Sequence, residues 1–153
     1  MQNKYAELLE EWRGLKTGYW LTDLANASAH LFNGLPDLNW VGFYLLVDGK
    51  LKLGPFQGQV ACVEIPVGKG VCGSAVSQCT SLRVEDVHQF PGHIACDSRS
   101  ASELVVPFGA PKVWGVLDLD SPTKARFSKE DQIFAEAFCS SLIDGWTVPP
   151  WGH

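Results

Sequence analysis

The chain lacks the features that would direct it to a membrane or a nucleic acid. Its 12 lysines and arginines are outnumbered by 17 aspartates and glutamates, and no basic run occurs. Sequence-independent binding to nucleic acid or to an anionic membrane would need the opposite sign of charge. No apolar run approaches the length of a membrane span, and residues 1–7 begin a polar helix without the apolar core of a signal peptide. We therefore expect a cytoplasmic protein with neither nucleic acid nor membrane among its partners.

The spacings of common metal and nucleotide sites are also missing. There is no Cys-x-x-Cys pair, and the histidines are not at the spacing of zinc ligands. The glycines of segment 68–73 do not have the spacing of a phosphate loop, and no Lys-Ser/Thr pair follows them. We accordingly predict no metal and no cofactor.

Cysteine, in contrast, is frequent for a cytoplasmic protein, at positions Cys62, Cys72, Cys79, Cys96 and Cys139. An odd number argues against a closed framework of structural disulfides. In a reducing compartment, catalysis or redox exchange is the remaining explanation for the cluster. A free cysteine can also be a small buried hydrophobic residue, and Cys139, in an apolar helical stretch, fits that alternative.

The pattern of apolar residues predicts one α+β domain over residues 1–153, with its core at about 17–144. Helices are expected at 1–12, 17–32, 70–78 and 129–143, the last with Ser128 and Asp131 at its N-cap. Strands are expected at 40–47, 50–55, 60–65, 82–87, 104–108 and 113–120. The short hairpin links favour a central antiparallel sheet with its helices segregated to one face. A short N-terminal helix and a tail rich in Pro and Trp flank the core.

One polar segment, 91–103, concentrates reactive side chains. It opens on Pro-Gly and carries a cysteine, a histidine, an arginine, two carboxylates and several hydroxyls, so it is predicted to be a loop. Cys96 lies among groups that can stabilise a thiolate or transfer a proton, and the thiolate is the nucleophilic form. The alternative is a surface loop that happens to carry a free cysteine.

Two further groups of residues share a face of a predicted strand. Asp118 and Asp120 point to the same side, and with Glu103 they could form an acidic recess. Trp40 and Tyr44 also share a face and could form the wall of a site for a cation with an apolar part. The alternatives are acids at a strand end or in the next turn, and aromatic side chains in an ordinary core.

Several motifs together resemble the free methionine-(R)-sulfoxide reductases, enzymes built on the GAF-domain fold. The resemblance covers about 20–138, and it includes three cysteines that a generic GAF domain lacks. The motifs are Asn39-Trp40-Val41-Gly42-Phe43-Tyr44, Ala61-Cys62-x-x-Ile65, Gly70-Val71-Cys72-Gly73, Phe90-Pro91-Gly92-His93-Ile94-Ala95-Cys96-Asp97, Ser102-Glu103 and Gly115-Val116-Leu117-Asp118-Leu119-Asp120-Ser121. Cys79, Cys139 and the tail lie outside the pattern.

The resemblance implies a role for each of these positions. Cys96 is implied as the catalytic cysteine, with Cys62 and Cys72 as its disulfide partners in an order left open. Glu103, Asp118 and Asp120 are implied to hold the substrate, with Glu103 also a candidate acid. Trp40 and Tyr44 are implied to form its aromatic wall.

The implied reaction is the reduction of free methionine-(R)-sulfoxide through a cysteine sulfenic acid and a disulfide. An external dithiol protein would then reduce the disulfide, and we expect thioredoxin in that role. The resemblance further implies a homodimer. Because fold alone does not choose a function, a small-ligand sensor and a redox switch without turnover remain the alternatives.

Overall fold

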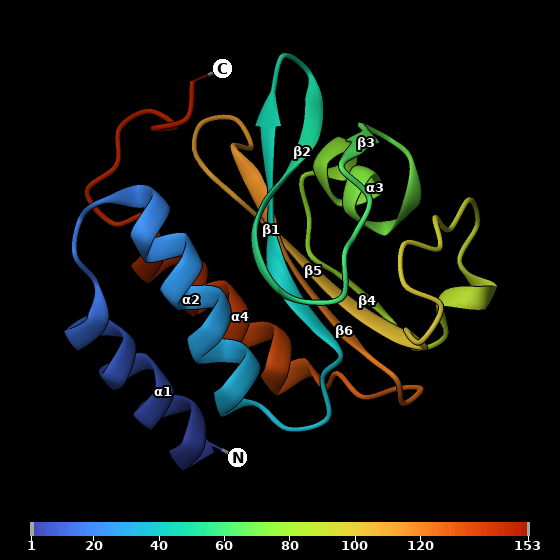
Figure 1. Cartoon of the computed structure of the whole chain (residues 1–153), viewed down its shortest axis with the longest axis horizontal. Coiled ribbons are helices and arrows are strands. Elements are labelled where there is room, and N and C mark those ends of the chain that lie inside the picture. Colours follow the sequence, from blue (N-terminus) through green and yellow to red (C-terminus); the bar gives the residue numbers. More distant parts are fainter. Residues whose placement is uncertain (1, 153) are drawn as a thin grey trace.

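A computed structural model describes residues 2–152, and Figure 1 shows a central antiparallel sheet covered by helices. The sheet has six strands in the order β3-β2-β1-β6-β5-β4. The strands are β1 (Trp40–Val47), β2 (Lys50–Gly58), β3 (Glu64–Pro66), β4 (Leu82–Val84), β5 (Ser102–Phe108) and β6 (Gly115–Ser121). The helices are α1 (Gln2–Leu15), α2 (Trp20–Gly34), α3 (Gly70–Gln78) and α4 (Lys129–Leu142), with a 3-10 turn η1 (Val87–Gln89). The antiparallel α+β architecture is therefore confirmed; of the expected first helix, Met1 lies outside the described residues.

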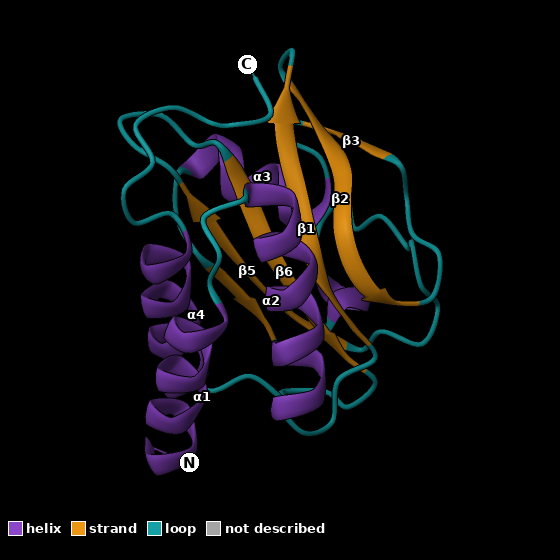
Figure 2. Ribbon diagram, turned by 60° about the vertical axis from the view of Figure 1, so that its left-hand side comes forward, coloured by secondary structure: helices purple, strands orange, loops and turns teal. Residues whose placement is uncertain are grey.

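The two faces of the sheet bury different cores, because successive side chains of a strand point to opposite sides. Helices α1, α2 and α4 cover one face, as Figures 1 and 2 show. Helix α3 packs on the opposite face, against β3, β5 and β6. The prediction that all helices lie on one face was wrong, since the buried side of α3 matches the second apolar face of the sheet. That second face carries the candidate site.

Two predicted strands are shorter than expected. The strand expected at 60–65 is instead β3 (Glu64–Pro66), which pairs with β2, while Val60 and Val63 are exposed. The chain there turns to bring Cys62 to the loop that carries Cys96. The strand expected at 82–87 ends at Val84, because the Asp86 side chain accepts a hydrogen bond from the His88 N–H and begins the 3-10 turn.

The last helix and the tail that follows it are held by specific contacts. The predicted N-cap of α4 is confirmed: Ser128 Oγ accepts from the Asp131 N–H (3.1 Å), and the Asp131 carboxylate accepts from the Ser128 N–H (2.8 Å). The tail packs back on the core through Trp151, whose ring lies 5.7 Å from that of Trp20 and 5.9 Å from that of Trp146. Among the described residues no helix is long and apolar enough to cross a membrane.

Candidate active site

Three acidic side chains meet on the face of the sheet that α3 covers. Asp118 and Asp120 are two residues apart on β6, so their side chains share one face. Glu103 of β5 lies directly opposite Asp120 in the antiparallel register. The three residues are only 7% (Glu103), 5% (Asp118) and 8% (Asp120) exposed. A buried carboxylate is costly unless it is paired. The cluster therefore calls for a proton or a bound cation.

The electrostatics of the cluster agree with this reading. Burial, together with the charge of Asp118, raises the pKa of Glu103 well above its usual value. Burial and the charge of Asp120 raise the pKa of Asp118, and burial and the charge of Glu103 raise that of Asp120. Because each charge opposes the next, at least one carboxyl retains its proton at a pH where an exposed acid is ionised.

The aromatic side chains of β1 lie beside the acids. Trp40 stands opposite Asp120 in the register, and its ring stacks between Tyr44 (5.9 Å) and Phe56 (5.2 Å). Its Nε1–H donates to the Gln59 carbonyl at 3.1 Å, which fixes the ring. Gly42 makes room, because a Cβ there would lie 2.7 Å from the Trp40 ring. The predicted common face of Trp40 and Tyr44 is confirmed.

A disulfide joins Cys62 to Cys96, with 5.3 Å between their Cα atoms. Tyr44 positions one end, since its hydroxyl donates to the Cys62 carbonyl at 2.9 Å. The other end is held through Asp97, which accepts from the Arg99 side chain (3.0 Å) and from Asn39 Nδ2 (3.1 Å). The hydrogen bond from Arg99 is the main cause that lowers the pKa of Asp97. The disulfide is therefore held at both of its cysteines, at Cys62 through Tyr44 and at Cys96 through the neighbouring Asp97.

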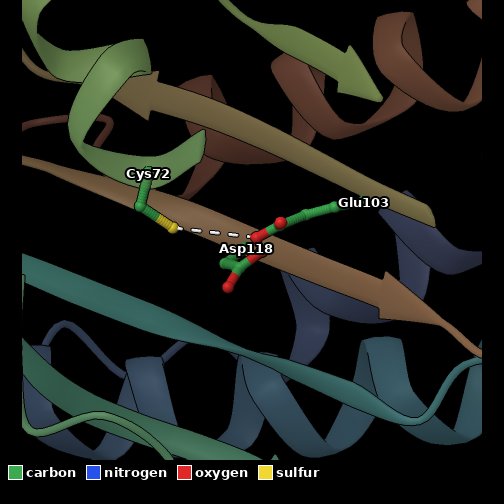
Figure 3. A group of neighbouring side chains, drawn as sticks. All are labelled: Cys72, Glu103 and Asp118. Atoms are coloured by element: carbon green, nitrogen blue, oxygen red, sulfur yellow. Dashed lines mark hydrogen bonds between the residues drawn. The ribbon is translucent and has the colours of Figure 1, made fainter. Parts of the chain in front are cut away.

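Cys72 is the third of the predicted cysteines, and it is a free, buried thiol. It lies in the first turn of α3, and its Sγ–H donates to Glu103 Oε2 at 3.9 Å, as Figure 3 shows with Asp118 alongside. Gly73 lets this turn approach β3, because a Cβ there would lie 2.4 Å from the Pro66 carbonyl oxygen. Burial and the charge of Asp118 raise the pKa of the Cys72 thiol well above its usual value. Cys72 is therefore a poor candidate for the thiolate nucleophile in the described state.

Of the eight residues predicted for the site, all but Cys62 line one recess, and Cys62 is joined to it through the disulfide. The recess encloses about 40 Å³ in this disulfide-closed form. Its walls are Trp40, Tyr44, Ala61, Ile65, Gly70, Val71, Cys72, His93, Ile94, Cys96, Asp97, Ser100, Glu103, Asp118 and Asp120. Cys79 and Cys139 lie outside it, and Cys139 is buried in the core on the other face, as the alternative reading expected.

Sequence reasoning gave no individual role to three polar residues at this site. His93 lines the recess, and burial, with the charge of His88, lowers its pKa. Asn39 also donates to Ser100 Oγ at 3.1 Å, so the two residues tie the end of the loop to the start of β1. The sequence places these residues within or beside motifs that carry reactive residues, which could have marked them as candidates. Their hydrogen-bond partners and their positions in the recess follow only from the fold.

The comparisons with known proteins agree on one family. Residues 21–142 match the family model of the GAF domain. The free methionine-R-sulfoxide reductase of Escherichia coli (strain K12) is 53% identical over 131 residues, which cover 84% of this chain and 79% of that protein. A structure of the Staphylococcus aureus protein fRMsr in complex with substrate has a TM-score of 0.87 at 48% identity, covering 92% of this chain and 94% of that one.

A second substrate complex, of the free methionine-R-sulfoxide reductase from Neisseria meningitidis, has a TM-score of 0.88 at 39% identity and covers 92% of this chain and 86% of that one. These similarities span most of each chain. All but one of the residues to which the resemblance assigns a role line the recess described above. The chain thus belongs to the free methionine-R-sulfoxide reductase family, within the GAF-domain fold.

Proposed function

We propose that this protein reduces free methionine-(R)-sulfoxide to methionine, with Cys96 as nucleophile. The observation that carries the proposal is the buried cluster of Glu103, Asp118 and Asp120 in the same recess as Cys96. Three acids crowded out of water repel one another, and the ammonium of a free amino acid offsets that repulsion. A methionine within a peptide has no such ammonium. We take the whole chain to act as one GAF domain around this recess.

The aromatic wall suits the other end of the substrate. The methyl-sulfinyl group can lie against the Trp40 ring, which is stacked and held in place by its own hydrogen bond. The free volume of about 40 Å³ in the disulfide-closed form accommodates water or an ion rather than an amino acid. We therefore propose that the substrate enters after the Cys62–Cys96 bond is reduced, when the loop carrying Cys96 is no longer tethered to Cys62.

The first step transfers oxygen from the sulfoxide to Cys96. The Cys96 thiolate attacks the sulfur while Glu103, whose pKa is raised by burial, donates a proton to the sulfoxide oxygen. The sulfur–oxygen bond of the substrate breaks, and the oxygen is left on Cys96 as a sulfenic acid. The methionine sulfur gains two electrons and the Cys96 sulfur loses two, so free methionine leaves without a further reductant.

The second step protects Cys96 and prepares it for another cycle. A cysteine thiol attacks the sulfenic sulfur, so that a disulfide forms and water leaves. We propose Cys62 as this first partner, since it is bonded to Cys96 in the structure. A dithiol protein of the thioredoxin kind then exchanges with the disulfide, returning two thiols and leaving oxidised itself. We further propose that Cys72 serves a later exchange, that the enzyme acts in the cytoplasm, and that it is a homodimer, as the resemblance implies.

The experiment that tests the proposal compares two substrates. Purified protein is supplied with a small dithiol and with either free or N-acetylated methionine-(R)-sulfoxide, and methionine formation is measured. We expect turnover of the free compound and at most a few per cent of that rate on the acetylated one, because acetylation removes the charge that the acids bind. Equal rates would contradict recognition of the ammonium. No turnover of either compound would favour a ligand sensor or a redox switch.

A further inference from the structure

One cluster in the recess has the composition of a metal site. The Cys72 sulfur and one carboxylate oxygen each of Glu103 and Asp118 lie within 4.8 Å of one another, and all three residues are buried (Figure 3). They come from three separate elements, α3, β5 and β6. No local spacing in the sequence brings them together, so the cluster exists only in the folded chain.

The cluster is incomplete as it stands. Asp118 is only 5% exposed, yet no described residue donates a hydrogen bond to its Oδ1 atom. A buried acceptor without a donor costs about 1–3 kcal/mol, and a charged one costs more. Within the trio, the Cys72 thiol donates to Glu103 over a long distance of 3.9 Å. An ion placed between the three side chains would satisfy all of them.

We propose that Cys72, Glu103 and Asp118 bind Zn²⁺ in the disulfide-closed protein. Zinc accepts sulfur and carboxylate oxygen at about 2.3 and 2.1 Å, which places tetrahedral ligands about 3.6 Å apart. The observed sulfur–oxygen separation of 3.9 Å needs only a small contraction. Calcium and magnesium prefer six or more oxygen ligands, so the thiol selects against them. This inference rests on the geometry of the cluster and not on the proposed activity.

The recess leaves room for such an ion and for one remaining ligand. Its free volume of about 40 Å³ adjoins all three side chains, and about 10–15 Å³ suffices for a water molecule. A zinc ion with three protein ligands and one water is the usual open arrangement. Because Cys62 and Cys96 are bonded to each other, neither thiol competes for the metal in this form.

The test titrates Co²⁺ into oxidised protein carrying Cys79→Ser, which removes the exposed thiol. We expect one equivalent to give a thiolate-to-cobalt charge-transfer band that Zn²⁺ abolishes by displacement. The band should be lost in the additional variant Cys72→Ser and retained in the matched control Cys139→Ser, which removes another buried thiol. Asp118→Asn, which keeps the thiol, should weaken Zn²⁺ at least tenfold by calorimetry, so the test does not depend on Cys72→Ser folding. Absence of the band in the Cys79→Ser protein, or its survival in Cys72→Ser, would overturn the proposal.

A second measurement asks whether metal and substrate share the site. In Cys62→Ser/Cys96→Ser protein, which has neither competing thiol and lacks the proposed nucleophile, Zn²⁺ is titrated with and without saturating free methionine-(R)-sulfoxide. The proposed position of the ammonium beside the same acids predicts at least tenfold weaker zinc binding in its presence. If direct titration shows that the sulfoxide binds while zinc affinity is unchanged, the shared position is wrong and the zinc site alone stands. If the sulfoxide does not bind at all, the failure belongs to the proposed function.

Discussion

Asp118→Asn should stabilise the empty protein while it weakens substrate binding. Asp118 is buried near Glu103 and Asp120, and its Oδ1 accepts no hydrogen bond from a described residue. Asparagine has nearly the same shape, carries no charge and can donate to the neighbouring carboxylates. The substitution therefore removes a repulsion and adds a donor next to a carboxylate cluster in which Asp118 Oδ1 receives no hydrogen bond from a described residue.

The sign and size of the effect follow from the raised pKa values. Burial first, and then neighbouring charge, raises the pKa of Asp118, Glu103 and Asp120 in the folded state. Such groups contribute their full stability below the unfolded pKa of about 4, and that contribution is lost as pH rises through the folded pKa. The variant should thus gain more at pH 8 than at pH 5. Because the buried acceptor gains a donor, the free energy of unfolding at pH 8 should rise by about 1–3 kcal/mol. Each kcal/mol corresponds to roughly 2–4 °C in Tm for a chain of this size.

The assay is urea unfolding of wild type and Asp118→Asn, both with the disulfide closed, at pH 5 and pH 8. Calorimetric titration of Cys96→Ser and Cys96→Ser/Asp118→Asn with free methionine-(R)-sulfoxide measures the cost in binding. Loss of one charge-assisted contact predicts about tenfold to a hundredfold weaker binding. If the variant is no more stable than wild type at pH 8, or if its gain does not grow with pH, the reasoning about repulsion is refuted.

The remaining predictions concern the cysteines and the last helix. Cys96→Ser should abolish methionine formation even with a small dithiol; substantial turnover would move the nucleophile to another cysteine. Cys62→Ser should leave the first turnover intact, as measured by methionine formed per enzyme. It should slow the steady-state rate of the thioredoxin-coupled cycle more than Cys72→Ser does. An unimpaired cycle in Cys62→Ser/Cys72→Ser would contradict the disulfide route. Ser128→Ala should lower the free energy of unfolding by about 1 kcal/mol, since it removes the acceptor for the Asp131 N–H; an unchanged urea midpoint would show that the α4 cap contributes little.

The sequence determined what depends on neighbours along the chain. Alternation and turn chemistry predicted β1 and its hairpin to β2, and the Ser128 cap predicted the start of α4. The same period of two put Asp118 and Asp120 on one face before any fold was known. Motif resemblance predicted the site residues from short stretches of sequence, without any knowledge of how those stretches pack together.

Only the tertiary structure decided what depends on the order of strands and the path of loops. Glu103 meets Asp120 because β5 pairs with β6 in one register, and a shift of one residue would turn either side chain to the other face. The buried face of α3 could not reveal which side of the sheet it would cover. The sequence does not distinguish Cys62 from Cys72 as the partner of Cys96. In the structure Cys62 is bonded to Cys96, whereas Cys72 on α3 faces Glu103. Local pattern fixes the face of a strand or helix, whereas proximity between distant segments arises only when those faces are packed together.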